Sequence, residues 1–124
     1  MKRILKTRTF CRWMRKALLE DGMLRKAIDE MERGLVDADL GGSIFKKRVA
    51  LPGRGKSGST RTLIATNRLS RWIFMYGFEK NGRENITQAE LTFLQQVARD
   101  LLECPEHALL AAIVHGELEE VDHA

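Results

Sequence analysis

The sequence predicts an α+β domain with two N-terminal helices, an antiparallel meander of strands and C-terminal helices. Apolar residues recur every three or four positions between residues 7 and 35, as on one face of a helix. Between residues 43 and 78 they form short segments separated by turns, as in strands, and the helical period returns after residue 87. A chain of 124 residues with 44% hydrophobic content can form one core, so we expect a single domain over residues 1–124.

The N-terminal region contains a short strand and two amphipathic helices. Ile4 and Leu5 can form the strand, and Thr7 or Thr9 can cap the helix that follows. The apolar stripe of this first helix consists of Phe10, Trp13, Met14, Ala17 and Leu18. The stripe of the second helix, which ends near Gly34, consists of Leu24, Ala27, Ile28, Met31 and Leu35.

Three strands are predicted in the middle of the chain, after a turn at Gly41-Gly42. They span residues 43–51, 59–66 and 71–78, and turns of a few residues join them. These lengths favour an antiparallel meander. With the N-terminal strand the sheet has about four strands.

The C-terminal region is predicted to be helical. Thr87 and Glu90 have the spacing of a capping box, which places a helix start there. The buried stripe of this helix consists of Leu91, Leu94, Ala98, Leu101 and Leu102. Pro105 ends it or begins a new helix, and residues 105–124 are expected to form a C-terminal helix and an acidic tail.

Charge is unevenly distributed, and the excess of cations lies on the predicted strands. Residues 43–83 contain ten Lys and Arg and a single acid, Glu79, although the whole chain carries only +4. Such a local excess predicts a polyanionic partner, and the alternative is a solvated basic surface.

Strand alternation assigns these cations to faces. Lys46 and Arg48 project to one face, and Lys47 projects to the other with apolar neighbours. A paired antiparallel strand would place Arg61 beside Lys46 and Arg48. Clustered like charges destabilise a fold unless an anion such as an RNA phosphate binds them. Simple solvation of these strand charges is the alternative.

Other motifs exclude several classes of function. Gly55-Lys56-Ser57 resembles part of a P-loop, but Ala50 replaces the first glycine and a strand follows, so we exclude nucleotide hydrolysis. No spacing of Asp, Glu, His or Cys matches a metal site, and no cofactor is expected. Cys11 and Cys104 are predicted to be buried free thiols, as in a reducing cytosol. We find no signal peptide and no membrane-spanning run, and we expect a cytoplasmic protein without a membrane partner.

Metal-free RNA cleavage requires a base for the 2′-OH, cations for the phosphate and an acid for the leaving 5′-oxygen. Lys and Arg can supply these roles. Tyr76 can stack on a base or assist proton transfer, and its alternative role is core packing.

Several short motifs together resemble the RelE/HigB-type toxins of bacterial type II toxin–antitoxin systems. They are Gly41-Gly42, Lys46-Lys47-Arg48, the glycine-rich segment from Gly53 to Gly58, Arg61-Thr62-Leu63, Tyr76-Gly77-Phe78, Lys80-Asn81, Asn85-Ile86 and Glu90-Leu91. The resemblance covers almost the whole chain. It implies a RelE-like fold, with two N-terminal helices packed on a curved, mainly antiparallel sheet of about four strands and with C-terminal helices. It also implies ribosome-dependent mRNA cleavage to a 2′,3′-cyclic phosphate.

The resemblance carries over to individual residues. It implies a catalytic set made of Lys46, Arg48, Lys56, Arg61, Tyr76 and Lys80. In the same basic segment we assign RNA contacts to Lys47, Arg54 and Arg83. The chain departs from the family pattern at Ser59 and Thr60, where Gly and an aromatic residue are usual, and at Glu79, where a small residue is common. The loss of an aromatic side chain at Thr60 affects base preference more than phosphate binding.

The resemblance also implies partners: a cognate antitoxin, often a small helix-turn-helix protein, and the 70S ribosome with its mRNA. The main alternative is a non-enzymatic ParE-like toxin that inhibits DNA gyrase by binding. Such toxins lack the clustered cations that this chain has at Lys46, Arg48, Lys56 and Arg61. A third class, a nucleic-acid-binding adaptor, would be expected to interleave more aromatic residues with its cations.

Overall fold

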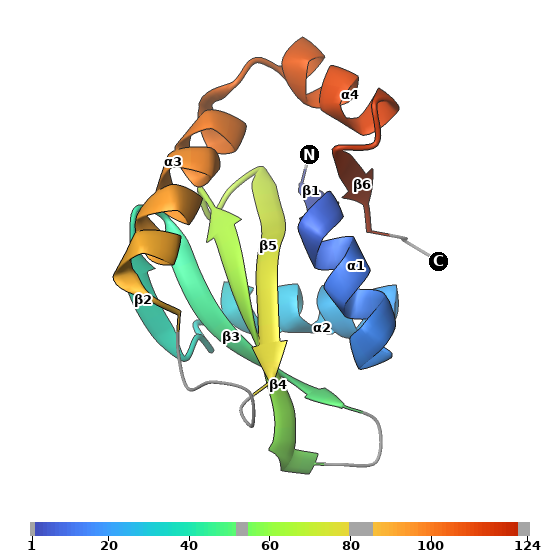
Figure 1. Ribbon diagram of the computed structural model, residues 1–124, viewed down its shortest axis with the longest axis vertical. Coiled ribbons are helices and arrows are strands. Elements are labelled where there is room, and N and C mark those ends of the chain that lie inside the picture. Colours follow the sequence, from blue (N-terminus) through green and yellow to red (C-terminus); the bar gives the residue numbers. More distant parts are fainter. Residues whose placement is uncertain (1, 52–54, 80–85, 122–124) are drawn as a thin grey trace.

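The computed structural model describes residues 2–51, 55–79 and 86–121, although not the side chains of residues 51 and 55–59. It confirms the predicted α+β class (Figure 1). The elements are β1 (Arg3–Thr7), α1 (Arg8–Ala17), α2 (Asp21–Glu32), β2 (Ala38–Gly41), β3 (Ile44–Leu51), β4 (Gly55–Thr66), β5 (Arg71–Glu79), α3 (Gln88–Glu103), α4 (Glu106–Val114) and β6 (Leu118–Glu120). No helix among the described residues is long and apolar enough to cross a membrane.

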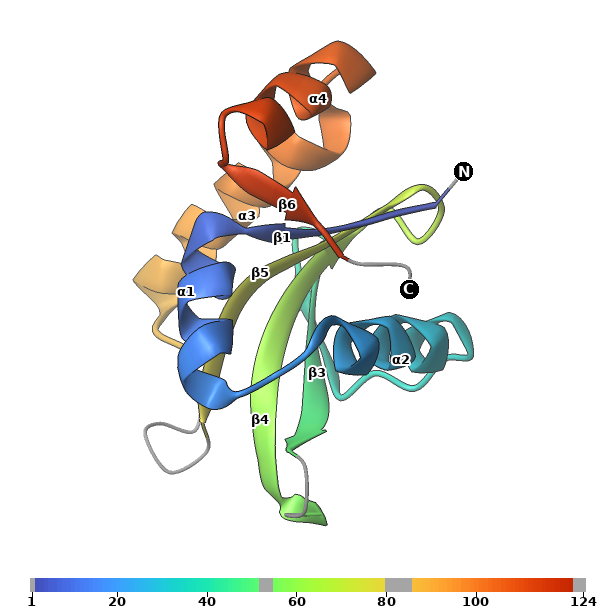
Figure 2. The same ribbon diagram turned by 90° about the vertical axis from the view of Figure 1, so that its right-hand side faces the viewer.

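The described residues form one sheet of six strands, in the order β2-β3-β4-β5-β1-β6. β1 pairs with β5 in parallel, and all other neighbours are antiparallel. The four predicted strands are therefore confirmed, and β2 and β6 add one strand at each edge. The sheet is strongly curved in side view (Figure 2).

Helices cover both faces of the sheet (Figures 1 and 2). Each face has its own apolar cluster. We call the two faces the α1/α2 face and the α3 face. The α1/α2 face buries Phe10 and Ile28 against Phe45, Ile64 and Phe74. On the α3 face, residues of α3 and α4 pack on another set of strand side chains, namely Leu5, Ile44, Leu63, Ala65, Ile73 and Met75.

Both N-terminal helices end earlier than their apolar stripes predict. Thr7 caps α1 as expected, because its side chain accepts a hydrogen bond from the Phe10 N–H. Leu18 adopts a left-handed conformation with φ 61° and is 77% exposed, so Leu19 fills the core position instead. Leu35 is likewise exposed, because α2 ends at Glu32 and the chain turns at Gly34.

A tight hairpin joins β2 to β3, one residue later than the predicted Gly41-Gly42 turn. Gly42 and Ser43 both have positive φ, 61° and 66°, as a type I′ turn requires. A side chain on Gly42 would meet Gln95 of α3, whose Cγ lies 2.7 Å from the position of the missing Cβ. Glycine therefore permits both the turn and the close approach of α3.

The C-terminal region differs from the predicted acidic tail. The capping box of Thr87 and Glu90 is confirmed at the start of α3. After α4, however, the chain forms β6, which pairs with β1 and continues with a hydrogen bond from the Val121 N–H to the Ile4 carbonyl at 2.9 Å. Leu118 is 2% exposed, so this segment packs as the edge strand of the sheet rather than extending into solvent as a tail.

Candidate functional site

Three neighbouring strands bring four of the predicted site residues to the α3 face. Arg48 of β3 lies opposite Arg61 of β4, and Lys46 lies two residues along β3 on the same face. Tyr76 of β5 lies opposite Leu63, the residue that pairs with Lys46. The register thus confirms that Arg61 lies beside Lys46 and Arg48. We call Lys46, Arg48, Arg61 and Tyr76 the cationic face.

Apolar side chains of the α3-face cluster lie beside these residues on the same face of the sheet. Phe78 lies opposite Arg61 and is 5% exposed, and Leu63 is fully buried. Tyr76 is half-buried and packs against this cluster, with its ring centroid 6.3 Å from that of Phe78. The tyrosine therefore contributes to the core and still presents part of its side chain to solvent.

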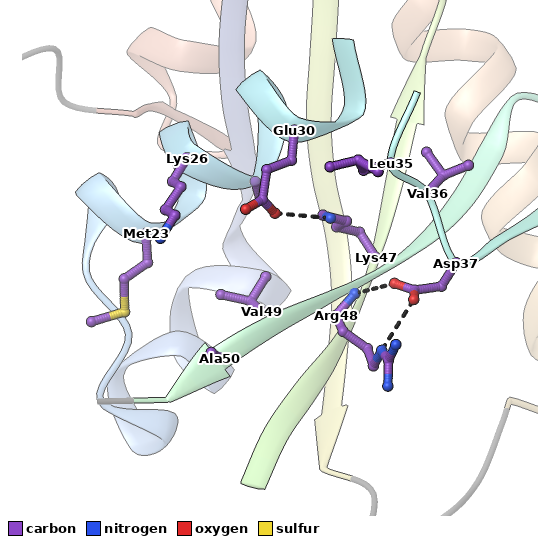
Figure 3. Close-up of a pocket in the computed structure, with 11 residues that line it drawn as sticks. Met23, Lys26, Glu30, Leu35, Val36, Asp37, Lys47, Arg48, Val49 and Ala50 are labelled. Atoms are coloured by element: carbon purple, nitrogen blue, oxygen red, sulfur yellow. Dashed lines mark hydrogen bonds and ion pairs between the residues drawn. The ribbon is translucent and has the colours of Figure 1, made fainter. Parts of the chain in front are cut away.

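Like charges face each other across β3 and β4. Directly opposite pairs of like charge destabilise a sheet by roughly 0.2–1 kcal/mol. Asp37, in the loop before β2, offsets part of this repulsion, because its Oδ1 accepts a hydrogen bond from Arg48 Nε at 3.0 Å (Figure 3). The Arg48 side chain remains 47% exposed. Sequence reasoning missed Asp37, since a single acid in a loop carries no recognisable signal.

Lys47 lies on the opposite face of β3, as alternation predicts. Its Nζ forms an ion pair with Glu30 of α2 at 2.9 Å, and only 8% of the residue is exposed (Figure 3). The hydrogen bond from Lys47 lowers the pKa of Glu30 below its usual value, and burial opposes this effect. Lys47 ties α2 to the sheet, so we withdraw its assignment to RNA binding.

Thr60 also lies on the α1/α2 face. It is fully buried, and its hydroxyl donates to the Val49 carbonyl at 3.1 Å. An aromatic residue at this position would point into the core between sheet and helices. The departure from the family pattern at Thr60 therefore leaves the cationic face unchanged, which corrects our expectation about base stacking.

The remaining predicted residues are only partly visible in the structure. Arg54, Lys80 and Arg83 lie outside the described residues, and for Lys56 only the backbone, on β4, is described. Among the described side chains, no three His, Cys, Asp or Glu residues gather in a way that could hold a metal ion.

A groove of about 450 Å³ runs between α2 and β3 on the α1/α2 face (Figure 3). Its apolar lining includes Met23, Val36 and Val49, and Asp37 and Arg48 lie at its rim. Arg48 thus stands at the edge between this groove and the cationic face.

The fold and the cationic face define a small α+β protein with Lys and Arg side chains clustered on the α3 face of its sheet. A family model described as "RelE toxin of RelE / RelB toxin-antitoxin system" matches residues 2–121. The chain therefore belongs to the RelE toxin family, which acts with a cognate antitoxin, and its fold is RelE-like. Comparison with curated proteins finds no match.

Proposed function

We propose that this toxin is a ribosome-dependent, metal-independent mRNA endoribonuclease that inhibits translation. The observation that carries the proposal is the pairing of Arg48 with Arg61 beside Lys46, on a face that is open at Arg48. Like charges at this spacing repel one another. A bound RNA phosphate would offset the repulsion, because its negative charge attracts all three cations.

The proposed reaction is an internal displacement at phosphorus. The 2′-oxygen attacks, the O2′–P bond forms and the P–O5′ bond breaks, which leaves a 2′,3′-cyclic phosphate and a 5′-hydroxyl. A base takes the 2′-OH proton and an acid protonates the 5′-oxygen. Arg48 and Arg61 hold the non-bridging oxygens of the phosphate, where negative charge develops.

The other predicted residues complete the proposal. Lys46, Lys56 and Lys80 are the candidates for proton transfer and for additional charge, and Tyr76 is the candidate for stacking on a base. Arg54 and Arg83 remain proposed RNA contacts. The proposed partners are the 70S ribosome with its mRNA in the cytoplasm, and a small helix-turn-helix antitoxin whose acidic or apolar segment covers the cationic face.

Primer extension on mRNA after brief induction of the toxin tests this function. The wild type should cut only messages that are being translated, and the downstream fragments should begin with a 5′-hydroxyl. Arg61→Ala should lower the cleavage rate by on the order of a hundredfold while the protein stays folded. Arg61→Lys should restore only part of the rate, because an ammonium cannot make the bidentate contact of a guanidinium.

Arg99→Ala is the matched control, since Arg99 is an exposed arginine on α3 outside the cationic face. It should cut like the wild type. Fragments that begin with a 5′-phosphate would contradict the proposed mechanism. Intact mRNA together with blocked DNA supercoiling would instead establish the alternative, a gyrase inhibitor of the ParE kind.

A further inference from the structure

We infer that Asp37 is a positioning residue that holds the Arg48 guanidinium for the phosphate; the inference rests on the proposed function. Asp37 directly precedes β2 and makes three contacts with β3. Its N–H donates to the Lys46 carbonyl at 2.9 Å. Its Oδ2 accepts from the Arg48 N–H at 2.6 Å, and its Oδ1 accepts from Arg48 Nε at 3.0 Å (Figure 3).

These contacts hold both the backbone and the side chain of Asp37 against β3. The backbone of Asp37 extends the β2–β3 ladder by one hydrogen bond, and Oδ2 then takes the place of a main-chain carbonyl as acceptor for the Arg48 N–H. With Oδ2 held there, Oδ1 lies along the Arg48 side chain and accepts from its Nε. The location of the guanidinium is therefore determined by the backbone of the hairpin rather than by a free rotamer.

The contact also determines which edge of the guanidinium is available. Arg48 Nε is occupied by Asp37, so the edge formed by the two terminal nitrogens is left for a ligand. That edge makes the two parallel hydrogen bonds by which arginine binds a phosphate. The Asp37 side chain is 24% exposed and that of Arg48 is 47% exposed, so the anchor lies deeper than the group that it holds.

The negative charge of Asp37 also offsets the repulsion between Arg48 and Arg61. Arg48 and Arg61 lie opposite each other on the strand pair, where like charges repel. The carboxylate keeps the arginine in place before RNA binds. Both of its oxygens accept hydrogen bonds from Arg48, so Asp37 acts through Arg48 and is not our candidate for the general base.

A double-mutant cycle on the cleavage rate tests the inference. Asp37→Asn should lower kcat by about 10- to 100-fold, the loss expected for a misplaced group, and should change KM less. In an Arg48→Ala background, Asp37→Asn should have no further effect on kcat. Asp37→Asn also removes the negative charge that offsets the repulsion between Arg48 and Arg61, and this costs stability. Asp37→Glu keeps the charge but shifts the guanidinium, so it should lower kcat without that loss of stability.

Asp39→Asn is the matched control. Asp39 lies on β2, and its Oδ1 accepts from the Gly41 N–H at 2.9 Å, so the variant has the same change in charge without a contact to Arg48. It should cleave at the wild-type rate. Two results would show that the inference is wrong while the proposed function stands. In the first, the wild type cuts mRNA and both Asp37 variants cut it at the wild-type rate. In the second, Asp37→Asn lowers kcat by the same factor in the Arg48→Ala background as in the wild type. If the wild type cuts no mRNA, both the inference and the proposed function fail.

Discussion

Lys46 and Lys47 are neighbours in the sequence, yet the structure predicts opposite outcomes when each is replaced. Lys46 belongs to the cationic face, whereas Lys47 holds Glu30 of α2. Lys46→Met should abolish cleavage and leave stability almost unchanged. Lys47→Met should keep cleavage, because its methylene chain is replaced by an apolar side chain of similar length and no RNA contact is lost.

The exposures of the two partners determine the magnitude of the stability effects. The Lys47 side chain is 9% exposed and that of Glu30 is 28% exposed. Glu30→Ala leaves a buried ammonium without its partner, which should cost about 3 kcal/mol. Lys47→Met leaves a carboxylate that water can reach, so the loss should stay within about 1 kcal/mol.

Urea denaturation of Lys46→Met, Lys47→Met and Glu30→Ala measures these differences. A fourth variant, Glu30→Gln, tests the pH dependence of the Glu30 contribution. The pKa of Glu30 is lowered in the folded protein, so its contribution is complete above the usual value of 4.5 and is lost as the pH falls through the lowered folded pKa. The difference between wild type and Glu30→Gln should therefore shrink below pH 4.5. Equal destabilisation by Lys47→Met and Glu30→Ala would refute the argument from exposure. Loss of cleavage in a stable Lys47→Met protein would return Lys47 to the RNA-binding surface.

Three further predictions concern packing, a thiol and a helix cap. Gly77→Ala should destabilise the fold by about 1–3 kcal/mol in thermal denaturation, because the new Cβ would lie 2.3 Å from the Trp13 ring; an unchanged Tm would contradict this. Burial raises the pKa of the Cys11 thiol to about 12, so a thiol reagent at neutral pH should label Cys104 first and Cys11 only on unfolding. Thr87→Ala removes the cap of α3 and should lower the free energy of unfolding by about 1 kcal/mol, with Thr87→Ser close to wild type.

Local signals in the sequence were sufficient for most of the fold. The period-2 pattern around Lys46 and Arg48 predicted which face each side chain takes, and the capping box predicted where α3 begins. Such signals work because they depend on residues a few positions apart. Leu18 shows their limit, since an apolar residue at the correct helical spacing adopts the left-handed conformation that ends α1.

Features that depend on distant contacts could not be predicted in this way. β6 contains two acids and one apolar residue, and it is a strand only because the edge of β1 is available to it. Asp37 is an ordinary loop acid until the β2–β3 hairpin brings it to Arg48. The placement of Arg61 beside Lys46 and Arg48 was therefore predictable from the sequence, whereas the contact of Asp37 with Arg48 was not.

The position of β1 inside the sheet has a consequence for the order in which the chain can fold during synthesis. The β3–β4–β5 meander pairs neighbours in the sequence and can form as soon as its strands have been made. β1 is made first, yet its partners are β5 and the late strand β6, and closing such long loops costs entropy. Leu5 of β1 is fully buried in the folded protein, and β1 has both of its neighbours only after β5 and β6 have been made. A chain that stops before residue 118 thus carries the arginines of the meander on a sheet whose apolar edge at β1 is still open.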